Sequence, residues 1–296
     1  MSGGDELSIP PRRRGAVRRF LASQPVGTIG LCVVVLMAAA AAFADWLAPY
    51  DPLALGFDTA LQPPSMEHLF GTDSLGRDIF SRVIFGARTA LTIGVSASLV
   101  GCSIGALIGI ASAYYGGLVD LIIQRLTDLM LALPIIVLAI VIVAIFGRST
   151  SEGIDLNVIF AIAIAIIPNA ARVIRSSALT IVTMPYVEAA RASGLRSARI
   201  ILRHIAPNVA APFLILVSAY IAQSILLEAA LSFLGLGVTE PQPSWGLMLS
   251  GNTSDFYREA PWMIVFPGLS ITVTVLAFSL VGDSLRDWFD PKFRVR

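Results

Sequence analysis

The sequence has little charge, few cysteines and histidines, and a single lysine. Only 14% of its 296 residues are Asp, Glu, Lys or Arg, whereas soluble domains carry roughly 25%. The only lysine, Lys292, lies near the C-terminus, so the chain cannot contain a phosphate-binding loop of the form GxxxxGK[ST]. If ATP drives this protein, another chain binds the nucleotide.

Cysteine and histidine are too sparse to indicate a chemical site. Cys32 and Cys102 both lie in apolar runs, which is typical of small packing residues rather than of a disulfide or a metal pair. His68 and His204 fall on opposite sides of the membrane in the topology given below, so they cannot share a site. We therefore expect no catalytic constellation, no metal site and no cofactor in this chain. The net charge of +1 gives no reason to expect a nucleic-acid partner.

Apolar residues are abundant, at 56% of the chain. A membrane-spanning helix needs about 20 mostly apolar residues, and Pro134 is expected to kink one of the predicted spans near its start. The fold class is therefore all-α and polytopic. We expect a basic N-terminal segment over 1–25, a membrane domain over 26–285 and a tail over 286–296. The apolar runs predict six spans, at about 26–44, 90–113, 129–147, 156–174, 209–235 and 262–282.

The distribution of Lys and Arg predicts the orientation. With both ends in the cytoplasm, the inner segments hold 16 of these residues and the outer segments hold 5, which is the arrangement that the positive-inside rule favours. The first apolar run is longer than the core of a cleaved signal peptide, and five further spans follow, which argues against cleavage. We expect a multi-pass protein of the cell membrane with both termini cytoplasmic.

The segment 184–208 is basic and rich in alanine, unlike the chain around it. Pro185 suits the start of a helix, Glu188 lies in the first turn, where a negative charge is favourable, and Gly194 can take the left-handed conformation that ends a helix. A second helix is predicted from about 196 to 205, ending before Pro207. This pattern favours an element that docks on a cytosolic protein over a basic loop that only obeys the topology.

The stretches "EAARASG" (188–194) and "HIAPN" (204–208) resemble the EAA loop of permease subunits of ABC importers. In that family the loop forms coupling helices that dock in a groove of the ATPase subunit. Ala206 stands where the family's pattern has leucine, a difference that affects packing more than docking. The resemblance implies an ATPase-coupling role for Glu188, Ala189, Ala190, Arg191, Gly194, Ile205 and Pro207.

Further stretches narrow the resemblance to the second of the two permeases in the dipeptide/oligopeptide/nickel branch. They are "LFGTDSLGRDIFSRVIFGARTAL" (69–91), "EAALSFLGLGVTEPQPSWGLML" (228–249) and "GDSLRDWFDPKFR" (282–294). The resemblance implies a transport subunit, not an enzyme, that forms half of a translocation pore for di- or oligopeptides. The implied partners are a second, different permease, two ATPase subunits that bind ATP and Mg, an extracytoplasmic substrate-binding protein and membrane lipid.

Two acid–base pairs lie four residues apart before the second span. Asp73 precedes Arg77, and Asp78 precedes Arg82, a spacing that supports a helix. We therefore expect a helix here, and an apolar stripe would lay it against the outer face of the membrane; the stripe is Leu75, Ile79, Val83 and Ile84. Local ion pairs are usually structural, so a salt-bridged lid is the favoured interpretation. Contact with the external binding protein is the alternative.

Small residues recur every four positions in the second span and therefore share one helix face, where two backbones can approach closely. Packing within the subunit and packing against the partner permease fit this pattern equally well. The residues are Ala97, Gly101, Gly105, Gly109 and Ala113.

Glu228 is the one acid expected inside a span, near the outer end of the fifth. A carboxylate in lipid is costly, so it is a candidate for lining the translocation path. Ser224 and Ser232 are each four residues away, and a structural role bonded to one of them is favoured. The alternatives to a peptide importer are a nickel or glutathione importer and a stand-alone ion-coupled transporter. The last needs more buried ionisable groups than Glu228 alone.

Overall fold

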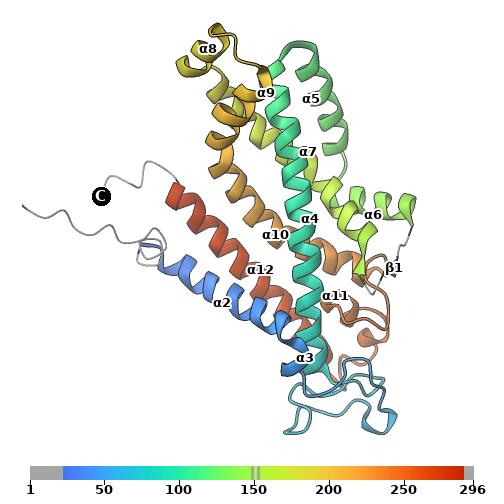
Figure 1. Cartoon of the computed structure of the whole chain (residues 1–296). Helices are drawn as coiled ribbons and strands as arrows, with labels where there is room; N and C mark the ends of the chain where they lie inside the picture. The colour runs from blue at the N-terminus through green and yellow to red at the C-terminus, as the bar shows by residue number, and fades with distance from the viewer. Residues whose placement is uncertain (1–22, 148–149, 152–153, 290–296) are drawn as a thin grey trace, which may run out of the picture.

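The computed structural model describes residues 23–147, 150–151 and 154–289. The predictions for the basic segment before residue 23 and for the tail after residue 289 lie outside this range. The helices form an elongated bundle (Figure 1). In chain order the elements are α2 (Pro25–Ala42), α3 (Ala44–Leu47), η1 (Phe57–Thr59), α4 (Ile79–Tyr115), α5 (Gly117–Leu131), α6 (Ile135–Phe146), β1 (Thr150–Ser151), β2 (Ile154–Asp155), α7 (Leu156–Val182), α8 (Pro185–Ala192), α9 (Ser197–Ile200), η2 (Ile201–Ile205), η3 (Ala206–Val209), α10 (Ala210–Phe233), α11 (Trp245–Met248), η4 (Gly251–Ser254) and α12 (Trp262–Phe289).

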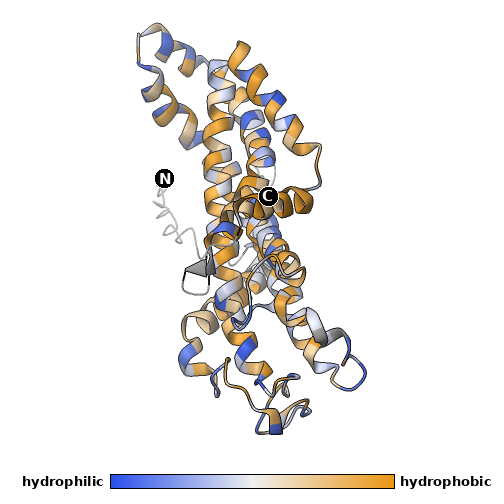
Figure 2. Ribbon diagram, turned by 90° about the vertical axis from the view of Figure 1, so that its right-hand side faces the viewer, coloured by the Kyte–Doolittle hydropathy of each residue, from blue (hydrophilic) through white to orange (hydrophobic). Residues whose placement is uncertain are grey.

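The all-α, polytopic class is confirmed. Among the described residues, five helices are long and apolar enough to cross a membrane: α2, α4, α7, α12 and the continuous helix Ser197–Phe233. The bent pair α5 and α6 makes a sixth if both belong to one span. The strands β1 and β2 form only a two-residue antiparallel pair before α7. Figure 2 shows apolar residues along the helices and polar residues gathered toward the two ends of the bundle.

The third predicted span, 129–147, is not one helix. α5 ends at Leu131, α6 begins at Ile135, and the two axes are bent by 94°. Pro134 between them has ψ 138°, an extended conformation that no α-helix contains. Proline also lacks the N–H that would continue the hydrogen bonds of the preceding turn. The expected kink is therefore a complete break, and the residues on both sides form a broken span or a re-entrant loop.

Several helices extend well beyond their predicted spans. α4 and the helix Ser197–Phe233 each contain 37 residues, which is about 55 Å at 1.5 Å per residue, against about 30 Å for the hydrocarbon core. The predicted spans 90–113 and 209–235 cover only part of each. α7 continues past residue 174 to Val182, and α12 continues to Phe289, so residues 286–289 of the predicted tail are helical.

The predicted helix end before Pro207 is also wrong. α9 passes through the turns η2 and η3 directly into α10. Pro207 lies in the first turn of η3, where a missing backbone N–H costs little. The second helix of the basic segment is therefore the start of a spanning helix, and it joins that segment rigidly to the bundle.

The centre of the bundle is the contact between α4 and α7. A methyl group added at Gly101 would lie 2.6 Å from the Ala163 carbonyl oxygen, and one at Gly109 would lie 2.5 Å from that of Ala171. A side chain at either position would require the two helices to move apart. The small-residue face of α4 therefore packs within the subunit, which resolves the two alternatives left by the sequence.

Candidate functional sites at the two ends of the bundle

The first site is the basic segment at the end of the bundle where Figure 1 shows α8 and α9. α8 ends at Ala192, and Gly194 takes the left-handed conformation with φ +72°. The Leu195 N–H donates to the Ala190 carbonyl at 3.2 Å, and the Gly194 N–H donates to that of Arg191 at 2.9 Å. These bonds close the helix as a glycine cap does. The predicted helix, glycine break and second helix are all present.

The segment is anchored by its apolar residues. Val187, Ala190, Ile200 and Ile205 are buried in a cluster with side chains of α4 and α7. The Arg191 guanidinium carbon lies 4.8 Å from the centre of the Tyr114 ring, near the end of α4. The segment is therefore held in one position against two long helices.

The opposite side of the segment faces outward. Of the seven residues assigned to coupling, Ala190 and Ile205 are buried, and the other five are exposed, namely Glu188, Ala189, Arg191, Gly194 and Pro207. Sequence reasoning missed the exposed apolar side chains Met184, Tyr186 and Leu202 in the same segment. In the sequence, only their position around a basic motif could have marked these side chains as part of a contact surface. Exposed apolar groups rimmed by charge are typical of a protein contact.

The second site lies at the other end of the molecule, where residues 69–78 precede α4. The predicted helix is absent there, and α4 begins only at Ile79. Asp73 instead folds the chain into a turn, because its Oδ1 accepts hydrogen bonds from the N–H groups of Leu75 and Arg77, both at 2.9 Å. An acid–base spacing of four is compatible with such a turn as well as with a helix.

Asp78 has a different partner from the one predicted. Its Oδ2 accepts a 2.8 Å hydrogen bond from the N–H of Ser81 and so caps α4, as aspartate commonly does at a helix N-terminus. Its Oδ1 lies 3.0 Å from Nδ1 of His68, which is also buried. Asp78 therefore holds the start of α4 and does not pair with Arg82.

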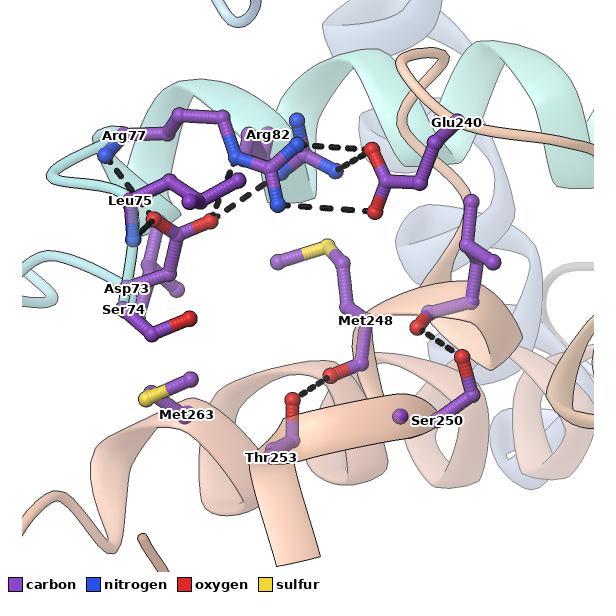
Figure 3. Close-up of a pocket in the computed structure, with 13 residues that line it drawn as sticks. Asp73, Ser74, Leu75, Arg77, Arg82, Glu240, Met248, Ser250, Thr253 and Met263 are labelled. Carbon is purple, nitrogen blue, oxygen red and sulfur yellow. Dashed lines mark hydrogen bonds and ion pairs between the residues drawn. The ribbon is translucent and has the colours of Figure 1, made fainter. Parts of the chain in front are cut away.

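Asp73, Arg77 and Arg82 do come together, and they are joined by Glu240 (Figure 3). Arg77 Nε donates to Asp73 Oδ2 at 2.6 Å, and its Nη1 donates to Glu240 Oε2 at 2.7 Å. Burial tends to lower the pKa of Arg77, but the hydrogen bond that Arg77 donates to Glu240 and the charge of Asp73 outweigh it and raise the pKa above its ordinary value. Arg77 is therefore a permanent cation that ties the turn to a distant loop.

Arg82 is buried beside Arg77 and is less completely bonded. Its side chain is 1% exposed, and its Nη1 donates to the carbonyl of Pro52 at 2.9 Å. Its Nε and Nη2 have no hydrogen-bond partner within the described ranges. They lie 4.0 Å from Asp73 Oδ2 and 3.9 Å from Glu240 Oε2, respectively. These are charge contacts without hydrogen bonds.

Glu228 is buried, with 1% exposure. Its Oε1 accepts hydrogen bonds from Ser232 and Ser244, both at 2.8 Å. Ser232 was one of the two predicted partners. The other, Ser224, has a buried hydroxyl that no group in the described part of the chain bonds. Ser244 was missed because it lies in a loop beyond the span. Glu228 thus ties α10 to the residue that precedes α11.

Comparison with known proteins assigns the family. The family of binding-protein-dependent transport system inner membrane components matches residues 105–295, and the N-terminal TM domain of oligopeptide transport permease C matches residues 13–64. A putative peptide transport system permease protein of Brucella suis is 42% identical, over 90% of this chain and 88% of its own.

Two further relatives have names that specify a substrate. A dipeptide transport system permease protein of Alkalihalophilus pseudofirmus is 40% identical, over 93% of this chain and 88% of its own. A glutathione transport system permease protein of Pectobacterium atrosepticum is 43% identical, over 94% of this chain and 90% of its own. The chain belongs to the binding-protein-dependent inner membrane component family and is a permease subunit of an ABC importer, of the oligopeptide permease C type.

Proposed function

We propose that this chain forms half of the translocation pore for di- or oligopeptides and pairs with a second, different permease. The names of the relatives, which refer to peptide, dipeptide and glutathione, support a peptide-like substrate. Glutathione is the second candidate, because the Pectobacterium relative is named as a glutathione transport permease. Glutathione is itself a short peptide. An extracytoplasmic binding protein delivers the substrate at the end that carries the pocket of Figure 3.

The observation that carries this proposal is the segment 184–208, which is exposed on one side and anchored in the core on the other. Two ATPase subunits bind ATP and Mg, and one of them receives this segment in a groove. This chain holds no cofactor and hydrolyses no nucleotide. When the ATPases close, they move the segment, and its buried residues carry the movement to α4, α7 and α10. Both termini lie on this cytoplasmic side of the cell membrane.

Co-purification from native membranes tests the coupling role. Gly194→Val places a branched side chain at φ +72°, where such residues are strained, so we expect it to lose the ATPase that the wild type retains. Gly147→Val is the matched control, because Gly147 has φ +70° and open space around it but follows α6. It should keep the ATPase. Retention by the Gly194 variant, or a chain that moves a solute alone without ATP, would refute the proposal.

A further inference from the structure

The pocket at the outer end combines a charged wall with an apolar one. Its cavity has a volume of about 220 Å³, smaller than the roughly 300–1,000 Å³ of a typical ligand pocket. Arg77, Arg82 and Glu240 line one side, and Met248 and Met263 lie across from them (Figure 3). A cavity of this size and lining suits one end of a larger ligand rather than the whole of it.

The charged wall is built to hold a carboxylate. Arg82 is fixed by the Pro52 carbonyl, yet two of its buried nitrogens have no hydrogen-bond partner among the described residues. A buried donor left without a partner is unfavourable, because it has given up its hydrogen bonds to water. Guanidinium groups pair best with carboxylates, often through two parallel hydrogen bonds. The arginines therefore have more donors than Asp73 and Glu240 satisfy.

Glu240 is the removable member of this cluster. Its side chain is 53% exposed, whereas those of Arg77, Arg82 and Asp73 are at most 10% exposed. If Glu240 swings into water, it regains its own hydration, and only the arginines lose a partner. An incoming carboxylate that replaces Glu240 restores that partner. The exchange conserves the charge of the cluster, so it avoids the penalty of an unpaired buried cation.

We propose that this pocket binds the C-terminal residue of the transported peptide, with the peptide's carboxylate displacing Glu240 from Arg77 and Arg82. The inference rests on the proposed function for the identity of the ligand. The apolar wall favours a peptide end over a fixed acidic side chain of the binding protein. Met248 and Met263 are unbranched and polarizable, and methionine surfaces adapt to side chains of different shape.

Methyl NMR of the assembled importer in lipid nanodiscs, without binding protein or ATP, tests the site directly. The methyl signals of Met248 and Met263 report on the pocket, and Met66, whose side chain is 98% exposed on a loop outside it, is the internal reference. The probes are trialanine and trialanine amide, which lacks the terminal carboxylate. We expect trialanine to shift the two pocket methyls and the amide to leave them unchanged. Equal shifts with both probes would overturn the proposal.

The variant Glu240→Gln gives a gain of binding that misfolding cannot imitate. If Glu240 occupies the arginines about nine-tenths of the time, its removal raises the affinity for trialanine about tenfold. Glu67→Gln, which changes an exposed acid outside the pocket, should leave the affinity unchanged. Adding Arg77→Lys to Glu240→Gln removes the planar two-donor fork and should abolish the gain. An unchanged affinity in Glu240→Gln would contradict the exchange.

A third probe identifies the source of the carboxylate. N-acetylglutamate α-amide carries only a side-chain carboxylate, as an acidic residue of the binding protein would. Weaker binding than trialanine supports the assignment to a peptide end, and equal or tighter binding overturns it. Because ATPase retention is measured separately by co-purification from native membranes, failure of this site leaves the proposed permease function standing.

Discussion

Replacing Gly101 with alanine tests how closely α4 and α7 are packed. The added methyl would lie 2.6 Å from the Ala163 carbonyl oxygen and 3.1 Å from Cβ of Ile166. An ordinary carbon–oxygen contact is about 3.3 Å or longer, so the two helices must separate locally by about 0.7 Å. Both α7 residues are buried, with 1% and 0% exposure, in the main apolar cluster. The neighbouring backbone therefore has little room to move.

The expected cost follows from two opposing effects. Overpacking a core costs about 1–3 kcal/mol, whereas alanine is more favourable than glycine in a helix by about 1 kcal/mol. Gly268→Ala in α12 is the matched control, because nothing lies within 4 Å of a methyl group added there. It gains the helix propensity without the clash. The difference between the two variants therefore isolates the clash, at about 1–3 kcal/mol.

Unfolding of the purified complex by denaturing detergent measures this difference. We expect the Gly268 variant to unfold at the wild-type detergent fraction or slightly above it, and the Gly101 variant below that of the control. If both variants unfold together, α4 and α7 are not packed as described. The small-residue face would then have to meet another chain.

Three further predictions concern polar and turn positions. Glu228→Gln keeps an acceptor for the hydroxyls of Ser232 and Ser244, so it should unfold near the wild type. Glu228→Leu removes that acceptor and should lower the free energy of unfolding by about 1–3 kcal/mol. Equal stability of the two variants would contradict this role. Gly194→Asn should retain the ATPase that Gly194→Val loses, because asparagine tolerates a positive φ, and co-purification decides. The hydrogen bond from Arg88 holds the pKa of the exposed Asp45 carboxyl below its ordinary 3.8, so the pair adds stability above that pH and loses it as the pH falls through the lowered value. When unfolding midpoints are measured over a pH series, Asp45→Asn should remove this small loss of stability at low pH. An unaltered loss would show that another group causes it.

Local signals in the sequence were enough to predict the helix and the glycine break within the segment 184–208. Pro185 and Gly194 each affect only the turn in which they lie. α8 begins at Pro185 and ends at Ala192, two residues before Gly194. The expected end at Pro207 was wrong because a proline in the first turn of a new element does not stop it. Hydropathy also underestimated helix length, since it detects the apolar part of α4 and not the helical turns beyond it.

The pocket lined by Asp73, Arg77, Arg82 and Glu240 was only partly predictable from the sequence. The sequence indicated Asp73, Arg77 and Arg82, but four-residue spacing does not distinguish a helix from the turn that Asp73 forms. Glu240 is 163 residues away from Arg77 in the chain. Its place in the cluster depends on how the loop after α10 folds back, which no local pattern reveals. The same loop supplies Ser244 to Glu228, so both omissions have one cause.

α4 contains no proline, unlike α7 and α12, which carry Pro168 and Pro267. It is therefore a single stiff rod, with Asp78 fixed at one end and Tyr114 in contact with Arg191 at the other. A rod of about 55 Å that pivots by about 10° at one end displaces its other end by about 10 Å. A small change of angle at the end of α4 beside Asp73 and Glu240 therefore produces a much larger displacement at the opposite end of the subunit.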